Sequence, residues 1–177
     1  LSNIEAISDI RTIKMMDIEE AKAKGLVTSF GPEIDEAFTN MLTKLVVDQE
    51  AINKQADMSI VYTPLHGSGN KPVRKILSMM GIKDVTVVPV QENPDGRFPT
   101  CSFPNPEIRE AFNEALKIAE SKKADLLLAT DPDCDRVGIA VLTGEEYVLL
   151  SGNDVGVLLA EYMLSARKEK GTLPENS

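Results

Sequence analysis

The chain has 177 residues, of which 19 are basic and 28 acidic, so its formal charge is −9. This acidic excess and an aromatic content of only 5% argue against nucleic acid or an anionic membrane as the main partner. No apolar run approaches the roughly 20 residues of a membrane span, and no secretory signal is visible. Cys101 and Cys134 do not make a disulfide framework, so we expect a cytoplasmic protein.

The first 30 residues predict a helical lead-in to a separate domain. Isoleucines recur there at every third position, which favours a helical arm with one apolar stripe; they are Ile4, Ile7, Ile10 and Ile13. A second short helix is expected at residues 17–24, ended by Gly25. Pro32 then suits the first turn of another helix, whose buried face would carry Ile34, Phe38, Met41, Leu42 and Leu45.

Strand and helix patterns alternate over the rest of the chain. The expected strands cover residues 59–64, 85–90 and 125–130, and the expected helices begin near residues 70 and 105. A hairpin through residues 143–145 and a last helix at residues 155–170 follow. This order is the βαβ pattern, and an apolar strand at 125–130 suits burial on both faces. We therefore expect residues 31–170 to form a three-layer α/β/α sandwich with a mixed, mostly parallel sheet, and residues 171–177 to be a linker.

Three aspartates alternate directly after the third expected strand, in residues 131–136 (Asp-Pro-Asp-Cys-Asp-Arg). Alternate side chains of an extended or turning loop lie on the same side of the chain. Three carboxylates held this close repel one another unless a positive charge lies among them, and a hard cation such as Mg²⁺ suits oxygen ligands best. We predict that Asp131, Asp133 and Asp135 bind Mg²⁺ at the carboxyl edge of the sheet, where open α/β sheets bind ligands. A solvated acidic turn is the alternative.

Two other kinds of acidic loop fit this segment less well. An EF-hand loop requires glycine at its sixth position and an acid at its twelfth, where this chain has Arg136 and Leu142. The haloacid-dehalogenase phosphatases also place Asp-x-Asp after an apolar strand, with Asp133 at the nucleophile position. That nucleophile normally comes early in the chain, whereas only 42 residues follow Asp135 here.

Arg136 completes the acidic loop, and two roles are open for it. It either neutralises the neighbouring aspartates in a structural ion pair or points outward to bind a phosphate, whose oxygens match the planar guanidinium. The spacing alone does not separate these two roles.

A glycine-containing loop at residues 63–72 joins the first expected strand to the following helix. Glycines expose backbone N–H groups beside the positive end of a helix, which suits an anion, although a tight turn is the simpler interpretation. The only histidine, His66, lies in this loop. Such a histidine more often forms structural hydrogen bonds, so substrate binding by His66 is a secondary hypothesis. The proline-rich residues 93–99 would lie on the same edge of the sheet, where we interpret their side chains as packing.

Taken together, these segments resemble the α-D-phosphohexomutase family, which includes phosphoglucomutases and phosphomannomutases. The motifs that carry the resemblance occur in the family's order and spacing; they are residues 63–67, 94–99, 104–107, 131–136 and 152–154. The similarity covers roughly residues 30–170 and is greatest to the bacterial phosphoglucomutase and phosphopentomutase branch.

The resemblance implies a specific place for this chain in a larger enzyme. Family members have four domains and move a phosphoryl group between the C1 and C6 oxygens of a hexose, through an enzyme phosphoserine and a bisphosphorylated sugar. By resemblance, this chain is the second domain, with Mg²⁺ on Asp131, Asp133 and Asp135 and with Arg136 beside the reacting phosphate. Its partners would be the sugar phosphate, the sugar bisphosphate and the other mutase domains in cis.

The family's nucleophile loop, Thr-Ala-Ser-His-Asn-Pro, does not occur in the sequence. We therefore expect the chain to be part of a longer protein, residues 171–177 to lead into a third domain, and the isolated chain to be inactive. Three alternatives remain: a pentose phosphate as substrate, a non-catalytic cation-binding module, and a dehalogenase-type phosphatase that uses Asp133.

Overall fold

The structure, a computed structural model, describes residues 2–175. The chain divides into two units with the boundary between Glu36 and Ala37, and each unit is described by itself. The expected division at residues 30 and 170 stays a prediction, and the end of the expected linker lies outside the described residues.

The first unit contains three short helical segments: α1 (Ser2–Glu5), the 3₁₀ turn η1 (Ile10–Thr12) and α2 (Ile18–Ala23). The helix expected at residues 17–24 is confirmed, and the Asp17 carboxylate caps it by accepting backbone N–H groups. The helical arm expected from the isoleucine spacing is present as two separate short segments, α1 and η1, rather than as one helix. Asp9 is extended and its carboxylate accepts the N–H of Arg11, so a separate turn starts there. The four isoleucines of the predicted stripe are all exposed.

The helix predicted to follow Gly31 is present as α3 (Pro32–Thr43), which crosses the unit boundary. Its predicted buried face is wrong for Ile34, Phe38, Met41 and Leu45, which are each about half exposed, while Leu42 is half-buried. Thr39 is the buried residue of this helix. The periodic pattern identified the helix and the side chains that share a face, but it carries no information on what covers that face.

The second unit is built on a five-stranded sheet with the order β2-β1-β3-β4-β5. The strands are β1 (Ser59–Thr63), β2 (Asp84–Val87), β3 (Leu126–Thr130), β4 (Val137–Thr143) and β5 (Glu146–Leu150). β1 pairs in parallel with β2 and β3, whereas β4 pairs antiparallel with β3 and with β5. Because only β4 runs against the other strands, the predicted mixed, mostly parallel sheet is confirmed.

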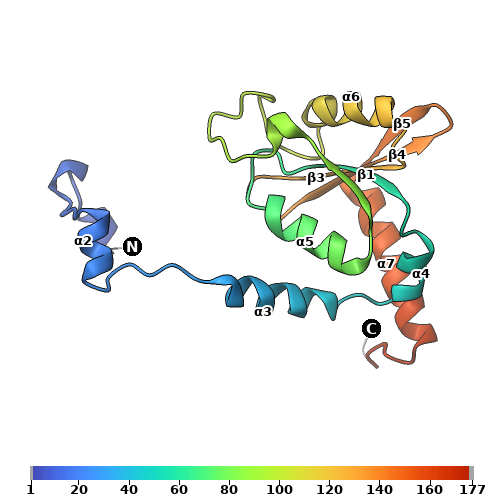
Figure 1. The fold of residues 1–177 in the computed structure, drawn as a ribbon, viewed down its shortest axis with the longest axis horizontal. Coiled ribbons are helices and arrows are strands. Elements are labelled where there is room, and N and C mark those ends of the chain that lie inside the picture. Colours follow the sequence, from blue (N-terminus) through green and yellow to red (C-terminus); the bar gives the residue numbers. More distant parts are fainter. Residues whose placement is uncertain (1, 176–177) are drawn as a thin grey trace. The chain divides into compact units, whose positions relative to one another are not determined.

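Helices cover both faces of this sheet, which confirms the three-layer α/β/α architecture. The helices are α4 (Gln49–Lys54), α5 (Asn70–Met80), α6 (Asn113–Lys122) and α7 (Gly152–Glu169). Figure 1 shows α6 on one face of the sheet and α5 and α7 on the other. The start of α7 is fixed by a capping box between Ser151 and Asp154. Among residues 2–175, no helix is both long and apolar enough to cross a membrane.

Two element boundaries differ from the sequence prediction for local reasons. β2 ends at Val87 rather than near residue 90, because Pro89 has no N–H to donate and opens the 3₁₀ turn η2 (Pro89–Gln91). The helix expected to begin near residue 105 is preceded by a side-chain turn, in which Asn105 Oδ1 accepts the N–H of Glu107 at 2.9 Å. Helical structure begins only with the 3₁₀ turn η3 (Arg109–Phe112), which leads into α6.

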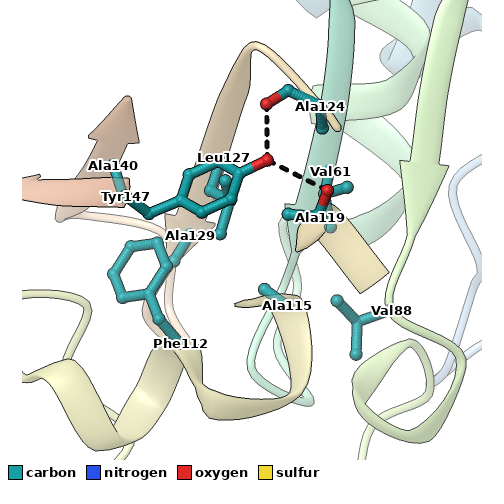
Figure 2. Close-up of a cluster of buried hydrophobic side chains, with 10 residues drawn as sticks. All are labelled: Val61, Val88, Phe112, Ala115, Ala119, Ala124, Leu127, Ala129, Ala140 and Tyr147. Carbon is teal, nitrogen blue, oxygen red and sulfur yellow. Dashed lines mark hydrogen bonds between the residues drawn. The ribbon is translucent and has the colours of Figure 1, made fainter. Parts of the chain in front are cut away.

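The main core lies between α6 and the sheet (Figure 2). It consists of ten buried residues, among which alanines allow the helix to approach the strands closely; they are Val61, Val88, Phe112, Ala115, Ala119, Ala124, Leu127, Ala129, Ala140 and Tyr147. The Tyr147 hydroxyl lies 2.9 Å from the Ala119 carbonyl oxygen and 2.7 Å from that of Ala124. These contacts join β5 to the carboxyl end of α6 and to Ala124 just beyond it, where the Ala119 carbonyl oxygen also accepts the backbone N–H groups of Lys123 and Ala124.

The winding of the chain reverses between β1 and β3. From β1 the chain passes through α5 to β2 on one side, and then through α6 to β3 on the other side of β1. Two loops therefore leave the sheet side by side at its carboxyl edge: residues 64–69 after β1 and residues 131–136 after β3. In open α/β sheets, this switch point is where ligands bind.

The contact between β5 and α6 gives the first prediction. Replacing Tyr147 by Phe removes the hydroxyl and leaves two buried carbonyl groups with one donor fewer. We expect the free energy of unfolding to fall by about 1–2 kcal/mol, measured by chemical denaturation. Tyr162→Phe, at a partly exposed position on α7, is the matched control and is expected to change stability little. Equal effects of the two substitutions would contradict the structural role of the Tyr147 hydroxyl.

Candidate metal centre

The three predicted metal ligands come together in the structure. Asp131, Asp133 and Asp135 each place one carboxylate oxygen within 4.8 Å of the others. The loop that carries them turns tightly, since the N–H of Cys134 donates to the Asp131 carbonyl oxygen at 3.0 Å and Cys134 has a φ of 62°. The residues on either side of Cys134 are Asp133 and Asp135, and their carboxylates lie on the same side of this turn, as the alternation in the sequence predicts.

Asp131 is the anchor of this loop. Its carboxylate is buried, with 1% of the residue exposed, although it directly follows β3. Its Oδ1 accepts the backbone N–H groups of Asp135 at 3.1 Å and of Arg136 at 3.0 Å, so the side chain folds the loop around itself. A buried carboxylate with these partners has one fixed position.

The environment moves the pKa values of two of the carboxyl groups in opposite directions. Burial by itself disfavours the charged form of Asp131, but the Arg136 amide, the Asp135 carboxyl group and the Arg136 charge outweigh it, so the pKa of Asp131 is lowered. The pKa of Asp135 is raised, first by its interaction with the Asp131 carboxyl group and then by the charges of Asp133 and Asp131. The cluster therefore contains negative charge that its own surroundings do not fully compensate.

The donor set of the cluster fits a hard divalent cation. All three groups offer carboxylate oxygens, which Mg²⁺ and Mn²⁺ prefer over softer ligands. Asp131 is held rigidly, whereas Asp133 and Asp135 are exposed and can adjust to the ion. A cation in contact with these oxygens would also remove the repulsion that raises the pKa of Asp135.

Arg136 forms a structural ion pair, which is one of the two roles that the sequence left open for this residue. Its Nε donates to Asp131 Oδ2 at 2.9 Å and lies 3.5 Å from Asp135 Oδ1. The Arg136 side chain is nevertheless 51% exposed. Both of these ion pairs run through the inner nitrogen of the guanidinium, so its terminal nitrogens extend farther from the Asp131 carboxylate. The ion pair and an outward phosphate contact are therefore geometrically compatible.

His66 lies in the neighbouring loop, and both of its ring nitrogens have partners inside the protein. Nδ1 is 3.0 Å from the Asn93 carbonyl oxygen, and Nε2 is 3.0 Å from Thr100 Oγ1. The residue is buried, and Phe98 packs against the ring edge-to-face at 6.2 Å. This geometry favours the structural interpretation of His66 over substrate binding, which stays a secondary hypothesis.

Three buried or half-buried polar residues that the sequence analysis did not single out support His66. The Thr63 hydroxyl donates to Gln91 Oε1 at 2.7 Å, and Gln91 Nε2 donates to Thr100 Oγ1 at 3.0 Å. Gln91 is fully buried although it lies at the end of the short 3₁₀ turn η2. A glutamine beside a proline-rich segment carries no local signal of burial, so only the tertiary structure reveals this network.

The loop at residues 93–99 follows η2 at the same edge of the sheet. Asp95 and Arg97 form a double ion pair within it, with Arg97 Nη2 at 2.7 Å from Asp95 Oδ2 and Nε at 2.9 Å from Oδ1. The hydrogen bond from Arg97 is the main reason that the pKa of Asp95 lies well below its usual range. Arg97 pairs with Asp95 of the same loop and is largely exposed. The ion pair therefore stabilises the conformation of the loop and not its packing against the sheet.

A family model described as "Phosphoglucomutase/phosphomannomutase, alpha/beta/alpha domain II" matches residues 36–144, which include the whole acidic loop. The chain belongs to the phosphoglucomutase/phosphomannomutase family. The resemblance drawn from the sequence motifs is confirmed at this level. Membership also leaves the dehalogenase interpretation without support, since the Asp-x-Asp segment lies within the matched family domain.

Curated relatives in the phosphoglucomutase/phosphomannomutase family carry names that differ in the sugar. The "Phosphoribomutase" of Saccharomyces cerevisiae is 44% identical over 58% of this chain, and the "Probable phosphomannomutase" of Haemophilus influenzae is 41% identical over 66%. The "Phosphoglucomutase" of Staphylococcus haemolyticus is 35% identical over 73%. This chain spans only 17%, 24% and 23% of the lengths of these three proteins, respectively.

Solved structures of the same family share the fold. A structure from Thermus thermophilus, described as a "putative phosphomannomutase", superposes with a TM-score of 0.61 at 26% identity and covers 78% of this chain and 29% of its own. A family protein from Burkholderia thailandensis, with a TM-score of 0.52 at 20% identity over 62% of this chain and 22% of its own, supports the fold alone.

The hydrogen bonds of Asp131 give a prediction for the protein without metal. Replacing Asp131 by Ala leaves two loop amides and the Arg136 side chain without their acceptor, and we expect a loss of about 2–4 kcal/mol in unfolding free energy. Replacing exposed Asp133 by Ala removes a repelling charge and is expected to leave stability unchanged or slightly raised. Chemical denaturation in the presence of a chelator measures both. A larger loss from Asp133→Ala than from Asp131→Ala would contradict the anchoring role of Asp131.

Proposed function

We propose that this chain is the metal-binding domain of a cytoplasmic phosphohexomutase that interconverts hexose 1-phosphate and hexose 6-phosphate, with glucose as the favoured sugar. In the complete enzyme the phosphoryl group would pass through an enzyme phosphoserine and a bisphosphorylated sugar. Family membership supports the general class of phosphotransferase. The observation that carries the proposal is the convergence of three carboxylates at the switch point of the sheet.

In this proposal Asp131, Asp133 and Asp135 hold Mg²⁺. The bound ion would supply positive charge that neutralises phosphate oxygens, which is a main requirement of phosphoryl transfer. Asp131 contributes a fixed oxygen, because its other contacts hold it in place, and the two exposed aspartates complete the protein's share of the ligands. Water or a phosphate oxygen would complete the octahedron that Mg²⁺ prefers.

Arg136 would bind the phosphate while remaining anchored to the metal loop. The hydrogen bond from Arg136 Nε to Asp131 fixes the inner end of the guanidinium group. Because the side chain is half exposed, its two terminal nitrogens can then reach phosphate oxygens. A planar guanidinium suits such oxygens because it offers parallel N–H donors. The metal and the arginine would thus act on the same phosphate from one rigid loop.

The choice of sugar rests on parts of the enzyme that this chain does not contain. The yeast relative named "Phosphoribomutase" favours a pentose phosphate as a second candidate substrate. The Staphylococcus haemolyticus relative named "Phosphoglucomutase" covers a larger share of this chain and favours glucose. Assays of the complete enzyme with glucose 1-phosphate and ribose 1-phosphate separate the two candidates.

The metal assignment is tested on the 177-residue chain. We expect Mg²⁺ or Mn²⁺ to change the NMR signals of residues 131–136, with roughly millimolar affinity, because three carboxylates leave the remaining ligands to water. Glu145→Gln, which removes an exposed acid from the hairpin turn, should bind the ion equally, whereas Asp133→Asn should weaken binding. We also expect no mutase turnover in a coupled assay. Turnover by this chain would overturn its predicted inactivity, and absence of any metal response would overturn the metal assignment.

In the complete enzyme, Asp133→Ala is expected to reduce turnover by about 100-fold or more, because the loss of a ligand weakens charge neutralisation at the phosphate. Folding should be affected little, since Asp133 is exposed. Turnover and thermal unfolding are measured on the same preparation. If Asp133→Ala keeps both its turnover and its Mg²⁺ dependence, the ligand set is wrong.

A further inference from the structure

The conformation of the acidic loop does not depend on its own hydrogen bonds alone, because the loop after β1 contacts it directly. The N–H of Ser68 donates to the Pro132 carbonyl oxygen at 2.8 Å, and the Ser68 hydroxyl lies 3.2 Å from the same oxygen. Pro132 stands between Asp131 and Asp133 in the chain. A contact at Pro132 therefore acts on the backbone that connects two of the proposed metal ligands.

At Gly67 the two loops are in van der Waals contact through their backbones. A Cβ atom added to Gly67 would lie 2.5 Å from the Pro132 carbonyl oxygen and closer still to its Cα. At Gly69 an added Cβ would lie 2.8 Å from Thr130 Oγ1 and 2.9 Å from Cys134 Sγ. These neighbours are the residue before the acidic loop and a residue within it. Glycine at both positions allows an approach that no other residue permits.

The loop that presses on Pro132 is itself under conformational strain. Leu65 and His66 both have positive φ values, 46° and 61°, a region that side chains with a Cβ rarely adopt. Such a turn persists only where its surroundings hold it. The surroundings are visible here, since the His66 N–H donates to the Gln91 carbonyl oxygen at 2.9 Å and the ring is held at both nitrogens.

The hydrogen bonds around His66 run in one direction and fix its tautomer. A carbonyl oxygen only accepts, so Nδ1 must carry the proton that binds Asn93. When the ring is neutral, Nε2 carries no proton and accepts from the Thr100 hydroxyl, whose oxygen accepts from Gln91. The Gln91 side-chain oxygen accepts from Thr63 at the end of β1. Each donor in this chain has its acceptor, so the turn is locked to β1 and to the loop after β2.

We propose that residues 64–69 form a positioning clamp, in which His66 locks the turn and Gly67 and Ser68 hold Pro132 so that the three aspartates stay at metal-binding distance. This inference rests on the proposed metal-binding function and assigns His66 the role of a positioning residue rather than of a substrate contact. The two roles differ in one measurable respect. A positioning residue alters metal affinity when no sugar phosphate is present, and a substrate contact does not.

The test compares Gly67→Ala with Gly156→Ala in the 177-residue chain. An added Cβ at Gly156, on α7, meets no atom within 4 Å, so this variant controls for the substitution itself. Mn²⁺ affinity is measured without sugar phosphate, together with the amide NMR signals of residues 131–136 in metal-free protein. We expect Gly67→Ala to bind Mn²⁺ about 10-fold more weakly or worse and to move those signals, because residues that orient metal ligands have effects of this size. Gly156→Ala should match the wild type.

Further substitutions that disturb the backbone less than Gly67→Ala can test the clamp if Gly67→Ala does not fold. Thr100→Val removes the hydroxyl that His66 Nε2 accepts from and preserves the shape of the side chain. His66→Asn retains a donor near the position of Nδ1 and tolerates a positive φ, whereas His66→Ala retains neither feature. We expect Mn²⁺ affinity to fall in Thr100→Val and in His66→Ala, with partial rescue in His66→Asn.

The possible results separate this inference from the function on which it rests. If the wild type binds Mn²⁺ and folded Gly67→Ala, Thr100→Val and His66→Ala bind it equally well, the clamp is overturned while the metal site stands. If the wild type binds no metal, the proposed function fails. In that case the metal-free signals of residues 131–136 still decide the clamp: unchanged signals in all three variants overturn it, and displaced signals support it.

Discussion

Mutual repulsion among three carboxylates is the constraint around which this edge of the domain is organised. Asp131, Asp133 and Asp135 converge to within 4.8 Å, although like charges at such a distance oppose one another. The arrangement is possible because Asp131 is charged, buried and fully hydrogen-bonded to the loop that carries the other two. One carboxylate thus fixes the loop, and the exposed pair retains the uncompensated charge that, in the proposed function, would bind a cation.

The sheet places this loop where it can act. Parallel pairing of β1 with β2 and β3 brings the loops after all three strands to one edge, and the reversal of winding between β1 and β3 sets two of them side by side. The antiparallel hairpin of β4 and β5 then extends the sheet beyond β3 and, through Tyr147, holds α6 against it.

The buried polar side chains at this edge of the sheet together hold one loop in place. Thr63, Gln91 and His66 are all buried, and each of them participates in one directional network that ends at the carbonyl group of Asn93. Buried polar groups are costly unless every donor finds an acceptor, and a complete network specifies a single loop conformation. The Thr-Pro-Leu-His-Gly motif therefore serves the geometry of its loop, while the Asp-Pro-Asp-Cys-Asp-Arg motif carries the charge.

The sequence by itself determined the alternation of strands and helices, the mixed three-layer fold and the grouping of the three aspartates. These features depend on local periodicity, on glycine and proline at element ends, and on side-chain alternation within five residues, all of which are written in neighbouring positions. Only the tertiary structure decided which face of α3 is exposed, that His66 bonds to Asn93 and Thr100, that Gln91 is buried, and that Gly67 touches Pro132. Those contacts join residues some 25 to 65 positions apart, or depend on what covers a surface, and no local pattern of residue types encodes either.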